Sequence, residues 1–393
     1  MNRCQTPFKA GKVSDTCAAD WPRVVRKFGQ ADGCTIERLG QDQVEALCDF
    51  FARAYADRPL AQAFSDRTLI RRRWTWWHEG NPARLDAAPQ AWVCRRQGQI
   101  IGHMAALPAV ALVNGRPLPV CWGADLIVAP ERRRHGLGPV LVMTLVQAMR
   151  QPVMIAGTNE DACPMFRRLG FADWGRLPLY VRVLRPRPFF DTMPWPPLVR
   201  RVTAAGWQAA GRVASRAPLS RPGAVVPLER FDERFDRWWQ PIERTFPGVI
   251  RRTSDTMTWR YHQHPHHHYQ AFGAMSAGAL RGVVVLRHGR SRGLPTGFIT
   301  ELLADPNDQQ TMGDLLAHAQ EVFTAHAQEA PVFIRCAVLP GAFGRALRRA
   351  GFLRVPSPIH WMVAHADGPS GLSDLAGRDG WFLNAGDSDL DVV

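Results

Sequence analysis

A six-residue stretch, Arg133-Arg134-His135-Gly136-Leu137-Gly138, carries the strongest chemical signal in this 393-residue sequence. It follows an apolar run over 121–128 that predicts a buried strand, and it precedes an apolar helix over 139–149. Backbone N–H groups at a helix start bind anions, because they lack partners within the helix and lie at the positive end of its dipole. Gly136 and Gly138 let the backbone approach such an anion closely. The stretch therefore predicts a site for a phosphate-type anion.

The spacing of this loop separates it from other phosphate loops. No Walker-type string occurs, and a dinucleotide fingerprint would need a third glycine. Arg-x-x-Gly-x-Gly between a strand and a helix resembles the pyrophosphate signature of the GNAT acyltransferases. After the next apolar strand, residues 159–171 resemble the second GNAT signature, Asn-x-x-Ala-x-x-x-Tyr-x-x-x-Gly-Phe, with Phe166 at the tyrosine position. Two motifs in this order make chance agreement improbable.

The resemblance implies an α/β (α+β) fold, with a mixed, mostly antiparallel sheet flanked by helices. That sheet would be splayed between its fourth and fifth strands, where the pantetheine arm inserts. Acetyl-CoA or another acyl-CoA would be the co-substrate, and no metal is expected. The implied cofactor-binding residues are Leu126, Ile127, Val128, Arg133, Arg134, His135, Gly136, Leu137, Gly138, Asn159 and Phe166.

Acyl transfer to an amine needs a base that takes the ammonium proton. Asp125 stands at the strand position from which GNAT members project a carboxylate, and Asn159 would lie near the thioester. A structural role for Asp125, satisfied by neighbouring donors, is the alternative, and Glu301 is then the next candidate base. Phe166 cannot donate the proton that the family tyrosine supplies. Water, a tyrosine such as Tyr180, or a loss of activity are the three alternatives.

The chain also repeats itself, because four landmarks recur in the same order roughly 180 residues later. The pairs are Trp76 and Trp259, Gly98 and Gly278, Asp125 and Glu301, and Gly170 and Gly351. We therefore expect two tandem GNAT-like domains. The expected segments are a poorly ordered arm (1–30), a GNAT domain with the acyl-CoA site (31–184), a Pro-rich and helical linker (185–227), a degenerate GNAT-like domain (228–366) and a tail (367–393).

When the two copies are aligned on Pro130 and Pro306, Met312 corresponds to Gly136 and Asp314 corresponds to Gly138. Both replacements add side chains where the backbone would meet a phosphate, and one adds a repelling charge. The second copy is therefore not expected to bind coenzyme A.

The net charge and the absence of known motifs indicate which classes of binding partner are to be expected. The net charge of +14 fits either an ordinary basic surface or a site for anions, but no nucleic-acid-binding motif occurs, so nucleic acid is an unlikely partner.

Residues 198–213 predict a basic amphipathic helix that either packs on one domain or makes a peripheral membrane contact. The histidine run over 262–268 is expected to face solvent. No apolar run approaches the roughly 20 residues that span a bilayer, and no segment resembles a signal peptide, so a cytoplasmic location is expected.

The leading function is an acyl-CoA-dependent N-acyltransferase that moves an acetyl group to a primary amine of a small molecule or amino sugar. The Trp-x5-Pro element and the Gly-Asp-Ser-Asp tail are similar to bacterial two-domain GNAT proteins associated with cell-surface polysaccharide assembly. Two alternatives stay open. A Fem-like aminoacyl transferase using charged tRNA fits the basic charge but has no need of the loop at 133–138. A non-catalytic GNAT-fold binding protein fits Phe166.

Overall fold

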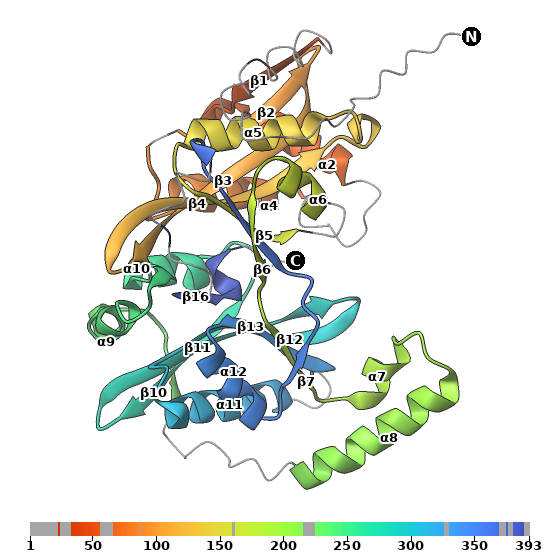
Figure 1. Cartoon of the computed structure of the whole chain (residues 1–393), viewed down its shortest axis with the longest axis vertical. Helices are drawn as coiled ribbons and strands as arrows, with labels where there is room; N and C mark the ends of the chain where they lie inside the picture. Colours follow the sequence, from red (N-terminus) through yellow and green to blue (C-terminus); the bar gives the residue numbers. More distant parts are fainter. Residues whose placement is uncertain are drawn as a thin grey trace.

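The computed structural model describes residues 23, 33–55, 66–86, 88–158, 162–214, 225–325, 330–368, 375 and 380–388. The expected arm over 1–30 lies outside these residues except for Arg23, and Asn159 and much of the tail also lie outside them. Figure 1 shows two halves stacked along the long axis of the molecule, with the first half above the second.

The first half is a sheet packed against helices. Its elements are β1 (Cys34–Arg38), η1 (Gln41–Gln43), α2 (Val44–Ala54), α4 (Arg67–Trp74), η3 (Thr75–Glu79), β2 (Ala91–Arg96), β3 (Gln99–Val113), β4 (Arg116–Val128), η4 (Pro130–Arg132), α5 (Leu137–Met149), β5 (Val153–Thr158), α6 (Ala162–Arg168), β6 (Ala172–Arg176) and β7 (Leu179–Val183). Buried leucines recur every four residues along α5 (Leu137, Leu141, Leu145), which is the spacing of a helix face that covers a core. Gly102 of β3 allows this close approach, because a Cβ there would meet Leu137 and Leu141 within 3 Å.

The second half repeats this order of main elements, with the additional strand β9 between its first two helices. They are β8 (Val225–Pro227), α9 (Glu233–Glu243), β9 (Gly248–Ile250), α10 (Ser254–Met257), η5 (Thr258–His262), β10 (Tyr269–Ser276), β11 (Ala279–Ser291), β12 (Leu294–Ala304), α11 (Gln309–Thr324), β13 (Phe333–Leu339), α12 (Gly341–Arg349), β14 (Leu353–Val355) and β15 (His360–Ala364). Gly282 of β11 matches Gly102, since a Cβ there would meet Thr311 and Leu315 of α11 within 3 Å.

The two halves exchange their last strands. β15, which belongs to the second half by sequence, pairs antiparallel with β5 and β6 of the first half. β7 in turn pairs antiparallel with β13 and β14 of the second half. The packing units therefore do not coincide with contiguous sequence segments, and each half needs a strand from the other. The sequence does not predict this exchange.

The described strands form one sheet of 16 strands, mixed but mostly antiparallel, as predicted for the fold class. Its parallel pairs are β4 with β5, β12 with β13, and β9 with β16 (Trp381–Asn384), which is followed by η8 (Ala385–Asp387). β16 also pairs with β13, and β9 pairs with β3, so these two short strands join the halves. Trp381 and Phe382 are fully buried and anchor the end of the chain.

A symmetric tryptophan pair marks the seam between the halves. Trp76 and Trp259 stack at 4.6 Å between ring centroids, and each indole Nε1 donates a 2.8 Å hydrogen bond to the backbone oxygen of the other residue. Both residues lie in π-helical turns, η3 and η5. His264 packs on Trp76 at 4.5 Å, so the histidine run expected to face solvent is half-buried at this point.

The connection between the halves is helical, as predicted, and its helices begin at the Pro-rich start. These residues form α7 (Pro186–Asp191), because proline is well suited to the first turn of a helix. α8 (Pro197–Ala214) follows and packs mainly against α7 rather than against either half. In Figure 1 α8 projects away from the sheet, while Phe189 of α7 packs edge-on against Phe333 of β13 at 5.6 Å. None of the described helices is long and apolar enough to cross a membrane.

Candidate functional site

The loop at 133–138 forms the start of α5, as predicted. Gly136 is the residue before the helix and has a φ of +83°, a left-handed conformation that glycine adopts without strain. Arg134 also has a positive φ, of +65°. Residues 133–136 are exposed, and no described side chain caps this helix start. A Cβ at Gly138 would meet only the Met165 sulfur, at 3.9 Å. The first N–H groups of α5 are therefore accessible to an anion.

β4 and β5 separate beside this loop. Their parallel pairing is confined to Cys121 with Val153 and Trp122 with Met154. Beyond that point the described residues of β4, including Leu126, Ile127 and Val128, have no partner on β5, which pairs with β15 on its other side. A fork between these two strands is what the family resemblance implies for the pantetheine arm. The backbone edge of β4 can therefore pair with an extended chain.

The equivalent helix of the second half is closed to an anion. The Asp308 side chain caps α11 by accepting hydrogen bonds from the Thr311 N–H (2.9 Å) and hydroxyl (2.7 Å). Gly102 of β3 faces Leu137, and Gly282 of β11 faces Thr311, so these two helix residues are equivalent. In this structural alignment Met312 corresponds to Gly138 rather than to Gly136. The sequence alignment is thus wrong by two residues. Met312 is fully buried, and the carboxylate at the helix start is Asp308 rather than Asp314.

Asp125 lies in a β-bulge of β4 with a φ of +51°. Both of its carboxylate oxygens accept hydrogen bonds from Arg73, at 2.5 and 3.0 Å, and its backbone oxygen lies 3.0 Å from His103 Nδ1. The carboxylate borders a cavity of only about 20 Å³ that His78 also lines. Burial, with smaller contributions from His103 and Arg73, lowers the pKa of His78 to about 3, so this imidazole is neutral.

The other predicted site residues are spread over the first half. Phe166 lies on α6, is 3% exposed, and packs edge-on against Phe171 at 5.0 Å. Its ring is part of the core rather than of an open surface. Arg133 and His135 are exposed, and the His135 Nδ1 lies 2.8 Å from the Arg133 backbone oxygen. Asn159 lies outside the described residues.

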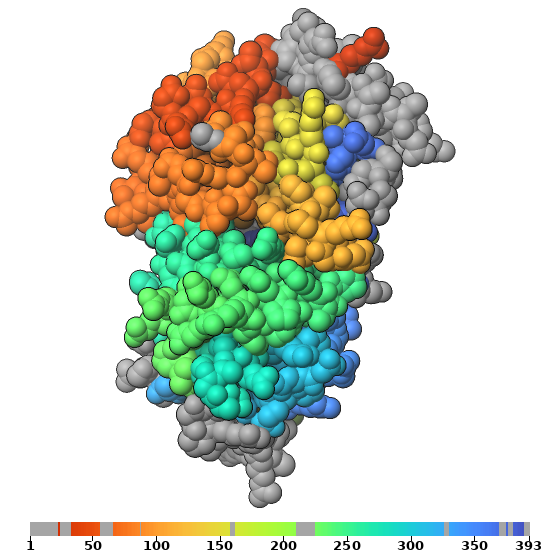
Figure 2. Space-filling view, turned by 90° about the vertical axis from the view of Figure 1, so that its left-hand side faces the viewer, coloured from red at the N-terminus to blue at the C-terminus, as the bar shows by residue number. Residues whose placement is uncertain are grey.

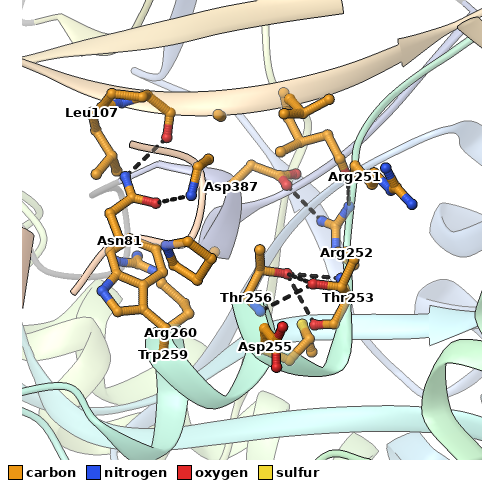
Figure 3. Close-up of a pocket in the computed structure, with 18 of the residues that line it drawn as sticks. Asn81, Leu107, Arg251, Arg252, Thr253, Asp255, Thr256, Trp259, Arg260 and Asp387 are labelled. Carbon is orange, nitrogen blue, oxygen red and sulfur yellow. Dashed lines mark hydrogen bonds and ion pairs between the residues drawn. The ribbon is translucent and has the colours of Figure 1, made fainter. Parts of the chain in front are cut away.

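A cavity of about 270 Å³ lies between the two halves (Figure 3). Its wall from the first half comes from residues 81–83, from β3 and from Trp122, the last residue of β4 that pairs with β5. Its wall from the second half comes from residues 250–261, Glu301 and Asp387. Figure 2 shows the orange surface of the first half directly against the green surface of the second half. The cavity therefore reaches the point at which β4 and β5 separate.

Ion-paired and hydrogen-bonded side chains form one wall of this cavity. Arg252, whose side chain is 4% exposed, donates to Glu301 at 3.2 Å and to Asp387 at 2.7 Å. Glu301 also accepts from the Tyr261 hydroxyl at 2.7 Å and from the Asn384 amide at 2.8 Å. Two carboxylates face one guanidinium, so with both carboxylates ionised the group carries an excess negative charge. In Figure 3 the Asp387 carboxylate points toward Arg252.

The pKa of Asp387 is raised to about 7. Burial is the largest cause, and the nearby Glu301 adds to it, while Arg252 and the Asn384 N–H oppose it. The same two carboxylates raise the pKa of Arg252 despite its burial. A carboxyl group that titrates near neutral pH can accept and release a proton during a reaction cycle.

One cluster has the geometry of a metal site. Ligand atoms of Cys163, Asp173 and His360 lie within 4.8 Å of one another where β15 enters the first half. However, Arg167 donates two hydrogen bonds, of 3.0 and 2.5 Å, to the same oxygen of Asp173. A cation bound there would be repelled by this guanidinium, so these residues do not fit a metal ion.

Comparison with known proteins places the loop and the fork within a match to a protein family. Residues 45–171 match the model of the acetyltransferase (GNAT) family. This part of the chain is a GNAT acetyltransferase domain. The match spans α2 to the end of the second signature and so includes both β4 and the loop at 133–138. At the level of the family, the activity is that of an acyltransferase that uses acyl-CoA. No curated protein matches the sequence.

Solved structures share the fold over both halves. A GCN5-related N-acetyltransferase from Anabaena variabilis is 13% identical with a TM-score of 0.55, and the match covers 85% of this chain and 73% of that one. N-myristoyltransferase from Saccharomyces cerevisiae, solved with bound myristoyl-CoA, is 10% identical with a TM-score of 0.56 and coverages of 84% and 82%. A probable N-acyltransferase from Enterococcus faecalis is 12% identical with a TM-score of 0.56 and coverages of 87% and 74%. At such identities the likeness is one of fold alone.

The sequence identifies the GNAT loop but, of the charged residues around the cavity, only Glu301. Arg252 and Tyr261 match no motif, and Asp387 reaches Arg252 because β16 and η8 return to the seam between the halves. One signal was present, since Asp387 belongs to the Gly-Asp-Ser-Asp tail that is similar to two-domain GNAT proteins.

Proposed function

We propose that the protein is an N-acyltransferase that transfers an acetyl or another acyl group from coenzyme A to a primary amine. The observation that carries this proposal is the open start of α5 beside the fork between β4 and β5. Backbone groups of residues 133–138 would hold the pyrophosphate. The edge of β4 at Leu126, Ile127 and Val128 would pair with the pantetheine arm. Bound acyl-CoA supplies the activated acyl group.

The acceptor occupies the cavity between the halves in this proposal. A volume of about 270 Å³ is close to the lower end of the range of roughly 300–1,000 Å³ for small-molecule sites. The Asp387 carboxylate can pair with a cationic ammonium group, although Arg251, Arg252 and Arg260 also line the cavity. Trp122 and Trp259 provide flat apolar walls. A small amine, with an amino sugar as the leading candidate, matches this combination of charge, aromatic rings and size.

The proton of the acceptor's ammonium group goes to Asp387. Its carboxylate lines the cavity, and its pKa of about 7 suits a base at neutral pH. The freed amine then forms a C–N bond with the acyl carbon and the C–S bond breaks. The new amide nitrogen gives up one further proton, which water carries to the departing thiolate, so coenzyme A leaves as the thiol. Asp125 and Glu301 remain alternative bases. All three carboxylates accept hydrogen bonds, Asp387 from Arg252 and the Asn384 N–H, and Glu301 from Tyr261, Arg252 and Asn384. Asp125 accepts from Arg73 and borders a much smaller cavity.

Residues 228–366 are, in this proposal, a diverged copy of the GNAT domain that shapes the acceptor site. Calorimetry with coenzyme A tests both parts of the proposal. We expect one molecule to bind per chain. Two molecules per chain would show that α11 also binds the cofactor.

Gly138→Asp should abolish this binding, because it places a carboxylate at the anion-binding helix start. The fold should survive, since a Cβ at Gly138 meets only Met165. Gln310→Asp is the matched control, because it adds the same charge to the second residue of α11, where the side chain is exposed. Binding that persists in Gly138→Asp would remove the basis of the proposed function.

A further inference from the structure

Exposed apolar side chains are concentrated on the connection between the halves. Among the described residues, six large apolar side chains are exposed, and four of them lie between positions 195 and 202. These four are Trp195, Leu198, Val199 and Val202, with Leu198 and Val202 exposed by 72% and 64%. Scattered single apolar residues are normal on a protein surface, but a local cluster of this kind marks an interaction site.

Leu198 and Val202 of this cluster lie on the face of α8 that points away from α7. On the face toward α7, Arg200 donates to the Asp191 backbone oxygen at 2.8 Å and Trp207 packs edge-on against Phe190 at 5.7 Å. A helix turns about 100° per residue, so Leu198, Val202 and Ala205 lie on the opposite side. α8 therefore has two apolar faces, and α7 covers only one of them.

The surroundings of this exposed face are basic. Residues 185–214 contain five arginines, one aspartate, and no lysine or glutamate. Arg187 on α7 and Arg201 on α8 are exposed. Trp195, which is 41% exposed, stacks on Phe190 at the turn between the helices. Exposed leucine and valine, flanking arginines and an aromatic side chain at the edge form the pattern of helices that lie in a membrane interface.

We propose that the α7–α8 pair docks the protein on the surface of an anionic lipid bilayer. Leu198 and Val202 would enter the boundary between headgroups and acyl chains, while Arg187 and Arg201 would contact acidic headgroups. In Figure 1 α8 projects away from the sheet, which places its exposed face where it can meet a flat surface. This inference does not depend on the proposed acyl transfer.

Co-sedimentation of the full-length protein with lipid vesicles tests the inference. We expect binding to vesicles of phosphatidylcholine mixed with phosphatidylglycerol, and much weaker binding to phosphatidylcholine alone. Leu198→Ser with Val202→Ser should weaken binding roughly tenfold or more, because the apolar contact is lost. Arg187→Gln with Arg201→Gln should weaken it by roughly fivefold for each arginine, and added salt should reduce this difference.

Matched controls separate docking from general effects of the substitutions. Leu85→Ser with Leu353→Ser removes two apolar side chains that are 46% and 48% exposed elsewhere. Arg72→Gln with Arg116→Gln removes two exposed charges on the first half. Both pairs should bind vesicles as the unmodified protein does. Equal binding to neutral and anionic vesicles, or no binding to either, would overturn the proposal. So would concentration-dependent dimerisation that Leu198→Ser with Val202→Ser abolishes, because the face would then join two copies.

Discussion

The two halves of this protein share an order of elements but differ at the two places where chemistry is expected. In the first half, α5 begins after an uncapped glycine loop, while in the second half Asp308 caps α11. The carboxylates on the equivalent strands show the opposite difference, because the more open site is in the second half. Asp125 faces a cavity of about 20 Å³, whereas Glu301 borders one of about 270 Å³. In our proposal the first half holds the cofactor, and the second half contributes most of the cavity that we assign to the acceptor.

The largest expected effect is a loss of kcat, which should distinguish Asp387 from Asp125 as the base. Asp387→Asn should lower kcat by roughly 10²–10⁴-fold, the usual contribution of a positioned base. Asp125→Asn should mainly lower thermal stability, because it breaks the pair with Arg73. Coenzyme A affinity should hardly change in either variant. A greater loss of kcat in Asp125→Asn than in Asp387→Asn would return the role of base to Asp125.

The pH profile of kcat provides a second measure of the same difference. A base must be deprotonated to act, and the pKa of Asp387 is raised to about 7. The rate should therefore fall as the pH decreases through about 7, and this acidic limb should be absent in the residual activity of Asp387→Asn. An unchanged limb in that variant would assign the titration to another group.

A smaller effect is expected at the turn that brings the end of the chain to the cavity. Gly386 lies so close to Tyr261 and Glu301 that a Cβ would overlap the tyrosine hydroxyl. Gly386→Ala should therefore destabilise the protein by about 1–3 kcal/mol, as overpacking does. Gly313→Ala is the control, because its Cβ meets nothing within 4 Å and a helical glycine gains from the change. Equal unfolding midpoints in the two variants would show that η8 moves aside easily.

The smallest expected effect concerns the symmetry of the seam. Trp76→Phe and Trp259→Phe each remove one of two matching 2.8 Å hydrogen bonds, so each should cost about 1 kcal/mol or slightly more in the free energy of unfolding. The two costs should be similar. Trp361→Phe controls for ring size, since its buried Nε1 has no hydrogen-bond partner among the described residues. Clearly unequal costs in denaturant titrations would mean that the pair is symmetric in geometry but not in energy.

Local patterns in the sequence predicted the local features of the fold. The loop at 133–138, the apolar face of α5 and the repeated tryptophans each depend on neighbouring residues, and each is present in the structure. The strand exchange was not predictable in this way, because β7 and β15 are both short apolar strands and either could complete either half. The role of Asp308 was missed because the alignment relied on prolines, while the helix position is set by contacts with Gly102 and Gly282. The cavity was missed because its walls come from segments far apart in the chain.

The exchange of β7 and β15 also has a consequence for folding during synthesis on the ribosome. Cys163 of the first half and Met362 of β15 are in contact although 199 positions separate them in the chain. Contacts of such long range form late, because a large loop must close before they can contribute. The first half therefore emerges with one strand missing and the edge of β5 uncovered. It can complete its sheet only after nearly the whole chain has been synthesised, so nascent copies depend on the second half for protection against aggregation through that edge.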